Sequence, residues 1–104
     1  MSFRGGFMRV TVKYYGVIKE LAGASLEEYD LPHGSSLKDL MNLIVNKHKG
    51  DGLYDKLWDK KENELKPLVM VVVDGEDPIE KGGYDMVKLK EGSKVELTMA
   101  FAGG

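Results

Sequence analysis

The chain has no cysteine among its 104 residues. It can therefore form no disulfide, offer no thiolate to a metal ion and carry no sulfur as a persulfide on its own side chains. Disulfides stabilise mainly secreted proteins, whereas cytoplasmic proteins do without them because thiols stay reduced there. We therefore expect a cytoplasmic protein.

An excess of charge of one sign and long apolar runs are missing as well. Lys and Arg total 15 against 17 Asp and Glu, a net charge of −2, so no basic field attracts nucleic acid. No apolar run approaches the roughly 18 residues of a membrane span, and residues 1–7 lack the apolar stretch of a secretion signal. We expect neither nucleic-acid nor membrane binding.

Recognisable catalytic motifs are absent too. The sequence contains no phosphate-binding loop, dinucleotide fingerprint, zinc-protease helix or nucleophile elbow. We interpret the only histidines, His33 and His48, as structural residues. The acidic pairs at 27–28 and 76–77 (Glu27, Glu28, Glu76 and Asp77) have no evident apolar pocket, so we interpret them as solvated surface. We expect no catalytic side chain, no metal site and no bound cofactor, and thus not an enzyme.

Hydrophobic alternation predicts the strands. Residues 8–15 and 95–101 alternate between apolar and polar side chains, and residues 26–31 form a second strand of the first hairpin. Residues 68–73 are apolar on both phases and lie between Pro67 and the Asp74-Gly75 turn. Residues 17–23 between the first two strands indicate a turn or a single helical turn.

One helix has a clear start signal. Ser36 and Asp39 form a capping-box pattern, and Gly50 stands where a left-handed helix end is expected. The apolar residues between them recur at helical spacing: Leu37, Leu40, Met41, Ile44, Val45 and His48. Residues 53–58 suggest a second, shorter helix, and residues 59–66 a solvated charged turn.

This order of elements predicts an α+β fold. We expect a mixed sheet of four to five strands packed on one main helix, with the first and last strands side by side. Residues 1–7 would be a loose arm, residues 8–101 the folded domain and residues 102–104 an exposed tail.

A strand that is apolar on both phases should expose one set of side chains, because a two-layer domain covers one face of its sheet. The exposed set is either Leu68, Met70 and Val72 or Val69, Val71 and Val73. We take the set of Leu68, Met70 and Val72 as the candidate partner surface. In the alternative, residues 79–87 fold over this face and bury it.

The chain ends on two glycines after the last strand, Gly103 and Gly104. A carboxylate becomes an acyl donor when adenylation turns its oxygen into a leaving group, and residues without a Cβ suit a narrow channel in a partner enzyme. Phe101 and Ala102 would enter the partner with them, although Phe101 could equally face the core. The alternative is an inert, flexible terminus.

Residues 8–104 resemble the ubiquitin-like β-grasp sulfur carriers, which include the small subunit of molybdopterin synthase (MoaD), the thiamin-pathway carrier (ThiS), the cysteine-pathway carrier and the archaeal small modifiers. The resemblance rests on four stretches: residues 10–23, 36–40, 64–77 and 89–104. The longer middle of the chain, residues 52–66, is more similar to the archaeal and cysteine-pathway members.

The resemblance implies a ubiquitin-like β-grasp fold and a carrier function. Gly104 would be adenylated at the expense of ATP by a ubiquitin-activating-type enzyme, then converted by a sulfur donor to a thiocarboxylate for molybdopterin or related biosynthesis. A large synthase subunit would be a further partner. Two alternatives stay open: a protein modifier joined to lysines through Gly104, and an adaptor that binds through its sheet without covalent chemistry.

Overall fold

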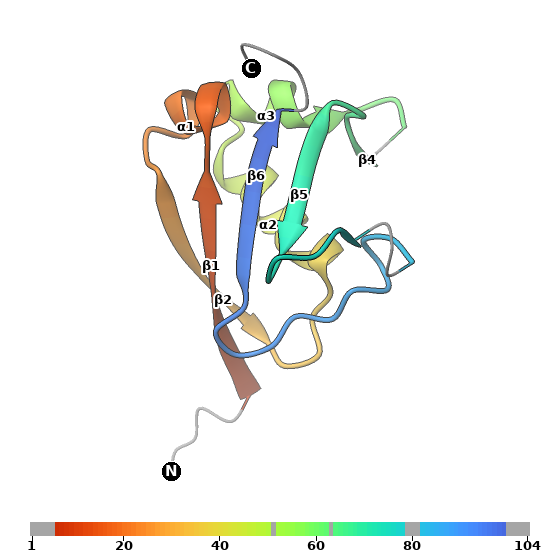
Figure 1. Ribbon diagram of the computed structural model, residues 1–104. Helices are drawn as coiled ribbons and strands as arrows, with labels where there is room; N and C mark the ends of the chain where they lie inside the picture. Colours follow the sequence, from red (N-terminus) through yellow and green to blue (C-terminus); the bar gives the residue numbers. More distant parts are fainter. Residues whose placement is uncertain (1–5, 51, 63, 79–81, 100–104) are drawn as a thin grey trace.

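The computed structural model describes residues 6–50, 52–62, 64–78 and 82–99 (Figure 1). In chain order the elements are β1 (Phe7–Tyr14), α1 (Gly16–Ala22), β2 (Leu26–Pro32), α2 (Leu37–Lys47), α3 (Leu53–Leu57), β3 (Trp58–Asp59), β4 (Glu64–Leu65), β5 (Val69–Val73) and β6 (Lys94–Met99). Helix α2 crosses behind one mixed sheet, which confirms the expected two-layer α+β arrangement.

The main sheet has four strands in the order β2-β1-β6-β5. The central strands β1 and β6 run parallel, and each pairs on its other side with an antiparallel neighbour. The expectation that the first and last strands lie side by side is therefore confirmed. The edges of the sheet are β2 and β5, while β3 and β4 form a separate two-stranded sheet.

Helix α2 begins as its sequence predicts. The Ser36 hydroxyl accepts from the backbone N–H of Asp39, and the Asp39 carboxylate accepts from the backbone N–H of Ser36, so both bonds of a capping box are present. The predicted left-handed end at Gly50 is wrong, because the helix ends at Lys47 with His48 as its cap and Gly50 does not have positive φ. The buried side of α2 meets the sheet through Leu37, Leu40, Met41, Ile44 and Val45.

Residues 16–22 form more than the single turn expected from their length. Helix α1 has seven residues, its Ile18 is fully buried, and Gly23 ends it in the left-handed region at φ 75°. Burial of an apolar side chain supplies the stability that so short a helix lacks by itself. Helices α1 and α3 lie at the end of the sheet toward which β6 runs (Figure 1).

The middle of the chain differs most from expectation. Trp58 leaves the short helix and enters β3, and the stretch interpreted as a solvated turn contributes strand β4, whose Leu65 is buried. Strand β5 starts at Val69 rather than Leu68, and β1 starts at Phe7, one residue before the expected boundary.

Candidate functional site

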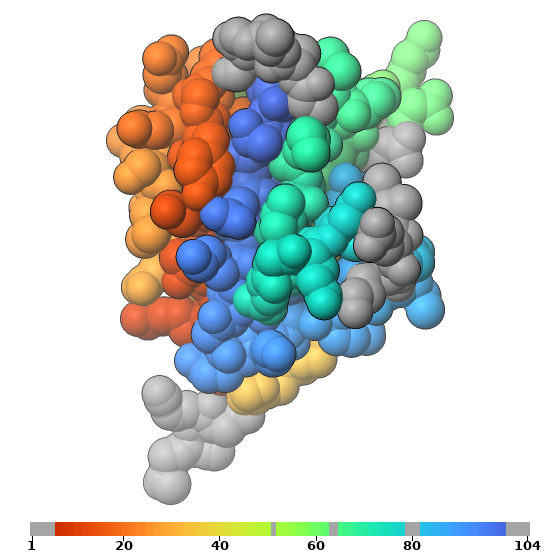
Figure 2. Space-filling view, viewed as in Figure 1, coloured from red at the N-terminus to blue at the C-terminus, as the bar shows by residue number. Residues whose placement is uncertain are grey.

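The exposed face of β5 is the first candidate site. Val69, Val71 and Val73 point into the core, whereas Leu68 is 51% and Met70 48% exposed and Val72 is half-buried. This side of β5 lies next to β6 on the open face of the sheet (Figure 2). Of the two sets that the sequence left open, the exposed one is Leu68, Met70 and Val72.

Polar side chains flank this apolar strip on the same face. Met70 is in register with Thr98 and Val72 with Glu96, both on β6. Across β6, the Tyr15 hydroxyl donates to the Glu96 carboxylate at 2.7 Å. The open face therefore changes from apolar on β5 to polar on β6 and at Tyr15 just after β1, the mixture expected of a surface that binds a partner reversibly.

Strand β6, which forms part of this face, is the last described strand before the end of the chain. Its final residue is Met99, and the strand runs toward the end of the sheet where α1 and α3 lie (Figure 1). The predicted tail residues Phe101, Ala102, Gly103 and Gly104 lie outside the described residues. Their roles stay predictions.

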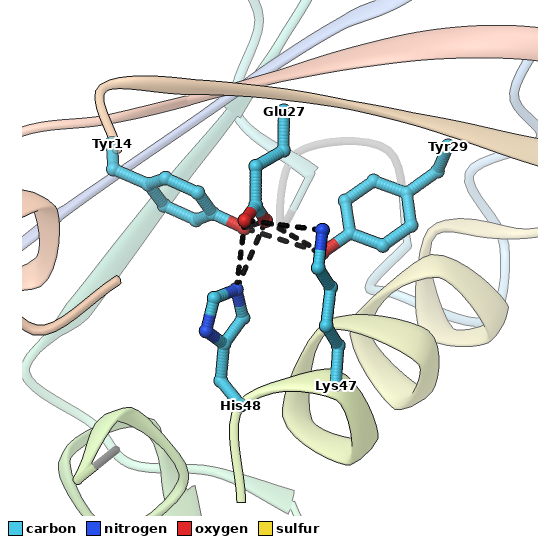
Figure 3. A network of polar contacts seen from close by, with 5 residues as sticks. All are labelled: Tyr14, Glu27, Tyr29, Lys47 and His48. Carbon is cyan, nitrogen blue, oxygen red and sulfur yellow. Dashed lines mark hydrogen bonds and ion pairs between the residues drawn. The ribbon is translucent and has the colours of Figure 1, made fainter. Parts of the chain in front are cut away.

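A second site is a cluster of polar side chains around one carboxylate, that of Glu27 on β2 (Figure 3). The hydroxyls of Tyr14 and Tyr29 donate to Glu27 Oε1 at 2.6 and 2.8 Å. His48 Nε2 lies 3.0 and 3.1 Å from the two carboxylate oxygens, and Lys47 Nζ lies 3.2 Å from Oε2. Two strands and the end of α2 thus converge on a single anion.

Burial and hydrogen bonding oppose each other at Glu27. Burial alone would raise its pKa, because the side chain is only 11% exposed, but the donors His48, Tyr14, Tyr29 and Lys47 outweigh it and lower the pKa from 4.5 to about 2. Burial and hydrogen bonding to the anion raise the pKa values of Tyr14 and Tyr29 above that of a free phenol. Glu27 therefore stays ionised, and both phenols stay protonated, at neutral pH.

The interpretation of Glu27 as solvated surface is wrong, although its neighbour Glu28 is exposed as expected. Strand alternation could have found this, because Glu27 shares its phase with the buried Tyr29 and Leu31. His48 is buried against Glu27 and His33 lies exposed in a turn. The cluster links β1, β2 and α2 through hydrogen bonds and ion pairs to one carboxylate. Because several donors already surround this carboxylate, little of it is accessible to a substrate.

The described ranges hold neither a candidate metal site nor a candidate membrane-spanning helix. No group of three or more His, Asp or Glu side chains there could hold a metal ion. No helix in that part of the chain is long and apolar enough to cross a membrane.

Comparisons with known proteins agree on the fold. The model of the ThiS family matches residues 12–104. The solution structure of Urm1 from Trypanosoma brucei has 27% identity and a TM-score of 0.71 and covers all of both chains. The small archaeal modifier protein 1 of Methanosarcina acetivorans has 21% identity and a TM-score of 0.71, covering 96% of this chain and 100% of that one.

A putative molybdopterin converting factor, subunit 1, from Pyrococcus furiosus has 24% identity and a TM-score of 0.69, with 90% of this chain and 99% of that one covered. No curated protein matches the chain by sequence. The fold is therefore the ubiquitin-like β-grasp.

Proposed function

Because the chain belongs to the ThiS family of small ubiquitin-like carriers, we propose that it is a sulfur carrier that acts through the carboxylate of Gly104. The observation that carries this proposal is the extent of the family match, which runs through Gly103 and Gly104. The absence of cysteine supports it, since the sulfur would travel on the main-chain carboxylate and need no thiol.

The chemistry proceeds in two steps, an adenylyl transfer followed by an acyl transfer. A carboxylate oxygen of Gly104 attacks the α-phosphorus of ATP and displaces pyrophosphate, which leaves an acyl adenylate. A sulfide from the donor then attacks the acyl carbon, the bond to the adenylate oxygen breaks and AMP departs, so that a thiocarboxylate remains. The partner enzyme holds the ATP, and this chain contributes the acyl group.

The thiocarboxylate would donate its sulfur in the biosynthesis of the molybdenum or tungsten cofactor (molybdopterin), or in a related cytoplasmic pathway. Support comes from the similarity in fold to the putative molybdopterin converting factor subunit of P. furiosus. The partners are then a ubiquitin-activating-type enzyme, a sulfur donor and, in a synthase, a large catalytic subunit.

The surface formed by Leu68, Met70 and Val72 is the proposed contact with the activating enzyme. It lies on β5 and the residue just before it, next to the strand β6 that leads to the tail, so docking there positions the chain end relative to the partner. Exposed Met and Leu side chains supply apolar area that becomes buried on binding.

Adenylation measured directly tests the proposal. The full chain, with its end first verified at Gly104 by mass, should support ATP–pyrophosphate exchange by the activating enzyme of its host. A chain lacking Gly104 should fold equally well and give no exchange. Exchange that persists without Gly104 would contradict the proposal, and partner binding that is indifferent to the tail, with no exchange, would favour the adaptor.

Conjugation to lysine is the second candidate function. The similarity in fold to a small archaeal modifier protein favours it, and it requires the same activated Gly104. A Gly-Gly remnant on lysines of other proteins, found in cells that express the full chain and absent without Gly104, would establish it.

A further inference from the structure

The two edges of the main sheet differ in how many backbone groups they leave unpaired. On β5, Val73 exchanges hydrogen bonds with Glu76 in both directions at 2.9 Å, and the N–H of Val69 donates to Lys66 at 3.1 Å. The ladder with β6 places Val69, Val71 and Val73 on the outer side of this strand. Local turns therefore protect the β5 edge on both sides of Val71.

Among the described residues, the β2 edge is open from Leu26 to Asp30, and only Pro32 at its end has its outward carbonyl paired, with Ser35. Its ladder with β1 keeps one register from Phe7↔Pro32 to Lys13↔Leu26. The flanking bonds from Tyr14 N–H to the carbonyl of Ser25 and from His33 N–H to the carbonyl of Gly6 fix which residues face β1. In this alternation the odd-numbered residues of β2 face β1, and Leu26, Glu28 and Asp30 direct their N–H and C=O groups away from the sheet.

Within the described part of the chain, no backbone group accepts from or donates to these outward groups of Leu26, Glu28 and Asp30. They recur at every second residue, with the spacing of one side of a strand ladder. An extended segment placed beside β2 could form up to six main-chain hydrogen bonds, about two for each of the three residues.

The outer face along this edge is acidic. Glu28 and Asp30 are both more than half exposed, and Arg9 on β1 forms ion pairs with them at 3.4 and 3.1 Å. Glu91 lies beside the same group, because its carboxylate accepts a hydrogen bond from the backbone N–H of Arg9. These three carboxylates and the one guanidinium have a net charge of −2, so side chains of an added strand on this face should be basic.

The inner side of the same edge combines the polar pair Glu27 and Lys47 with apolar surface. Leu43 and Lys47 lie one helical turn apart on α2, and Lys47 reaches Glu27 and lies 5.3 Å above the ring of Tyr29 on β2. Leu43 is 40% exposed. An apolar side chain on the inner face of an added strand would therefore find Leu43 and Tyr29 beside it.

We propose that the β2 edge binds an extended, basic segment of a partner protein by strand addition, with Lys or Arg facing Glu28 and Asp30 and apolar residues facing α2. A second copy of this chain does not fit. Antiparallel pairing of two β2 edges about Glu28 would bring like carboxylates together across the interface, which is destabilising. The site is separate from the Leu68, Met70 and Val72 surface and does not depend on the sulfur-carrier proposal.

Peptide binding followed by NMR tests this proposal. The probe is a short peptide of alternating lysine and valine, and its matched control alternates glutamate and valine. The lysine peptide should shift the amide signals of Leu26, Glu28 and Asp30 and slow their hydrogen exchange, while Met70 stays unchanged. The glutamate peptide should bind at least about tenfold more weakly, and added salt should weaken the lysine peptide.

Two variants separate main-chain pairing from charge. Glu28→Pro removes one outward N–H without breaking a bond to β1 and should abolish the slowed exchange, since an edge strand tolerates proline on its free side. Glu28→Gln removes the same carboxylate but keeps the N–H, and should retain the slowed exchange. Glu28→Lys with Asp30→Lys should reverse the preference between the two peptides. Glu20→Lys with Glu62→Lys changes the net charge equally, at exposed positions in α1 and between β3 and β4, and should leave the preference intact.

Several results would overturn the proposal: failure of the lysine peptide to bind the unmodified chain, binding that maps to β5, or binding unchanged by Glu28→Pro. Self-association of the free chain through β2 would assign the edge to a second copy instead. Urea unfolding of each variant measures its stability, so that a loss of binding can be distinguished from a loss of fold.

Discussion

Replacing Glu27 by glutamine tests whether its contacts with Tyr14, Tyr29, Lys47 and His48 stabilise the folded state. The change keeps the size of the side chain but removes the anion on which these donors converge. Lowering the pKa of Glu27 from 4.5 to about 2 corresponds to about 3 kcal/mol of folding free energy. We expect Glu27→Gln to lower the free energy of unfolding at pH 7 by about 2–3 kcal/mol, since the amide oxygen can still accept one phenol.

The effect has a defined pH dependence. The pKa of Glu27 is lower in the folded than in the unfolded chain, so its contribution is complete above about pH 4.5 and is lost as the pH falls toward 2. The stabilities of the original chain and Glu27→Gln should therefore converge between pH 4.5 and 2.

Urea unfolding followed by the fluorescence of Trp58, at pH values from 7 to 2, measures this difference. Glu28→Gln is the matched control, because Glu28 is the adjacent residue, is 53% exposed and forms only a surface ion pair with Arg9. Its effect should stay below about 0.5 kcal/mol at every pH. Equal effects of the two substitutions, or a Glu27→Gln effect that does not decline at low pH, would refute this account.

Three other substitutions follow from the structure. Ser36→Ala removes a hydroxyl of the capping box and should cost about 1 kcal/mol in urea unfolding, whereas no loss would mean that the box does not stabilise α2. Gly23→Ala meets open space but forces a Cβ into φ 75°, so a cost of about 1 kcal/mol is expected and a gain in stability would contradict it. Met70→Glu should lower kcat/KM for adenylation at least about tenfold without changing stability; the matched control Met86→Glu, at a 65% exposed methionine outside the proposed surface, should not.

Much of the fold could be predicted from the sequence because local signals agree with tertiary packing there. The alternation in β1 and β6 and the Ser36 capping box are short-range patterns, and the structure keeps all three. The adjacency of β1 and β6 followed from the order of elements under the usual rules of sheet topology.

The parts that could not be predicted depend on contacts between residues far apart in sequence. Helix α1 is too short to be stable alone and forms because Ile18 is buried. The β3–β4 hairpin forms in a charged stretch because Trp58 and Leu65 reach the core. Local composition contains neither fact.

For the candidate sites, alternation left two possible sets of exposed side chains on β5. Only the position of α2 behind the sheet shows that Leu68, Met70 and Val72 are the exposed set. The Glu27 cluster was missed because its partners come from β1, β2 and the end of α2. The phase that Glu27 shares with Tyr29 and Leu31 was the one local signal for it.

The central claim is that this chain carries sulfur on Gly104. Its most direct test is the intact mass of the protein after incubation with the activating enzyme of its host, ATP and a sulfide donor, for the full chain and for the chain lacking Gly104. We predict a mass gain equal to the replacement of one oxygen by sulfur, in the full chain alone. An unchanged mass, while the same enzyme forms an acyl adenylate on the chain, would contradict the sulfur-carrier account.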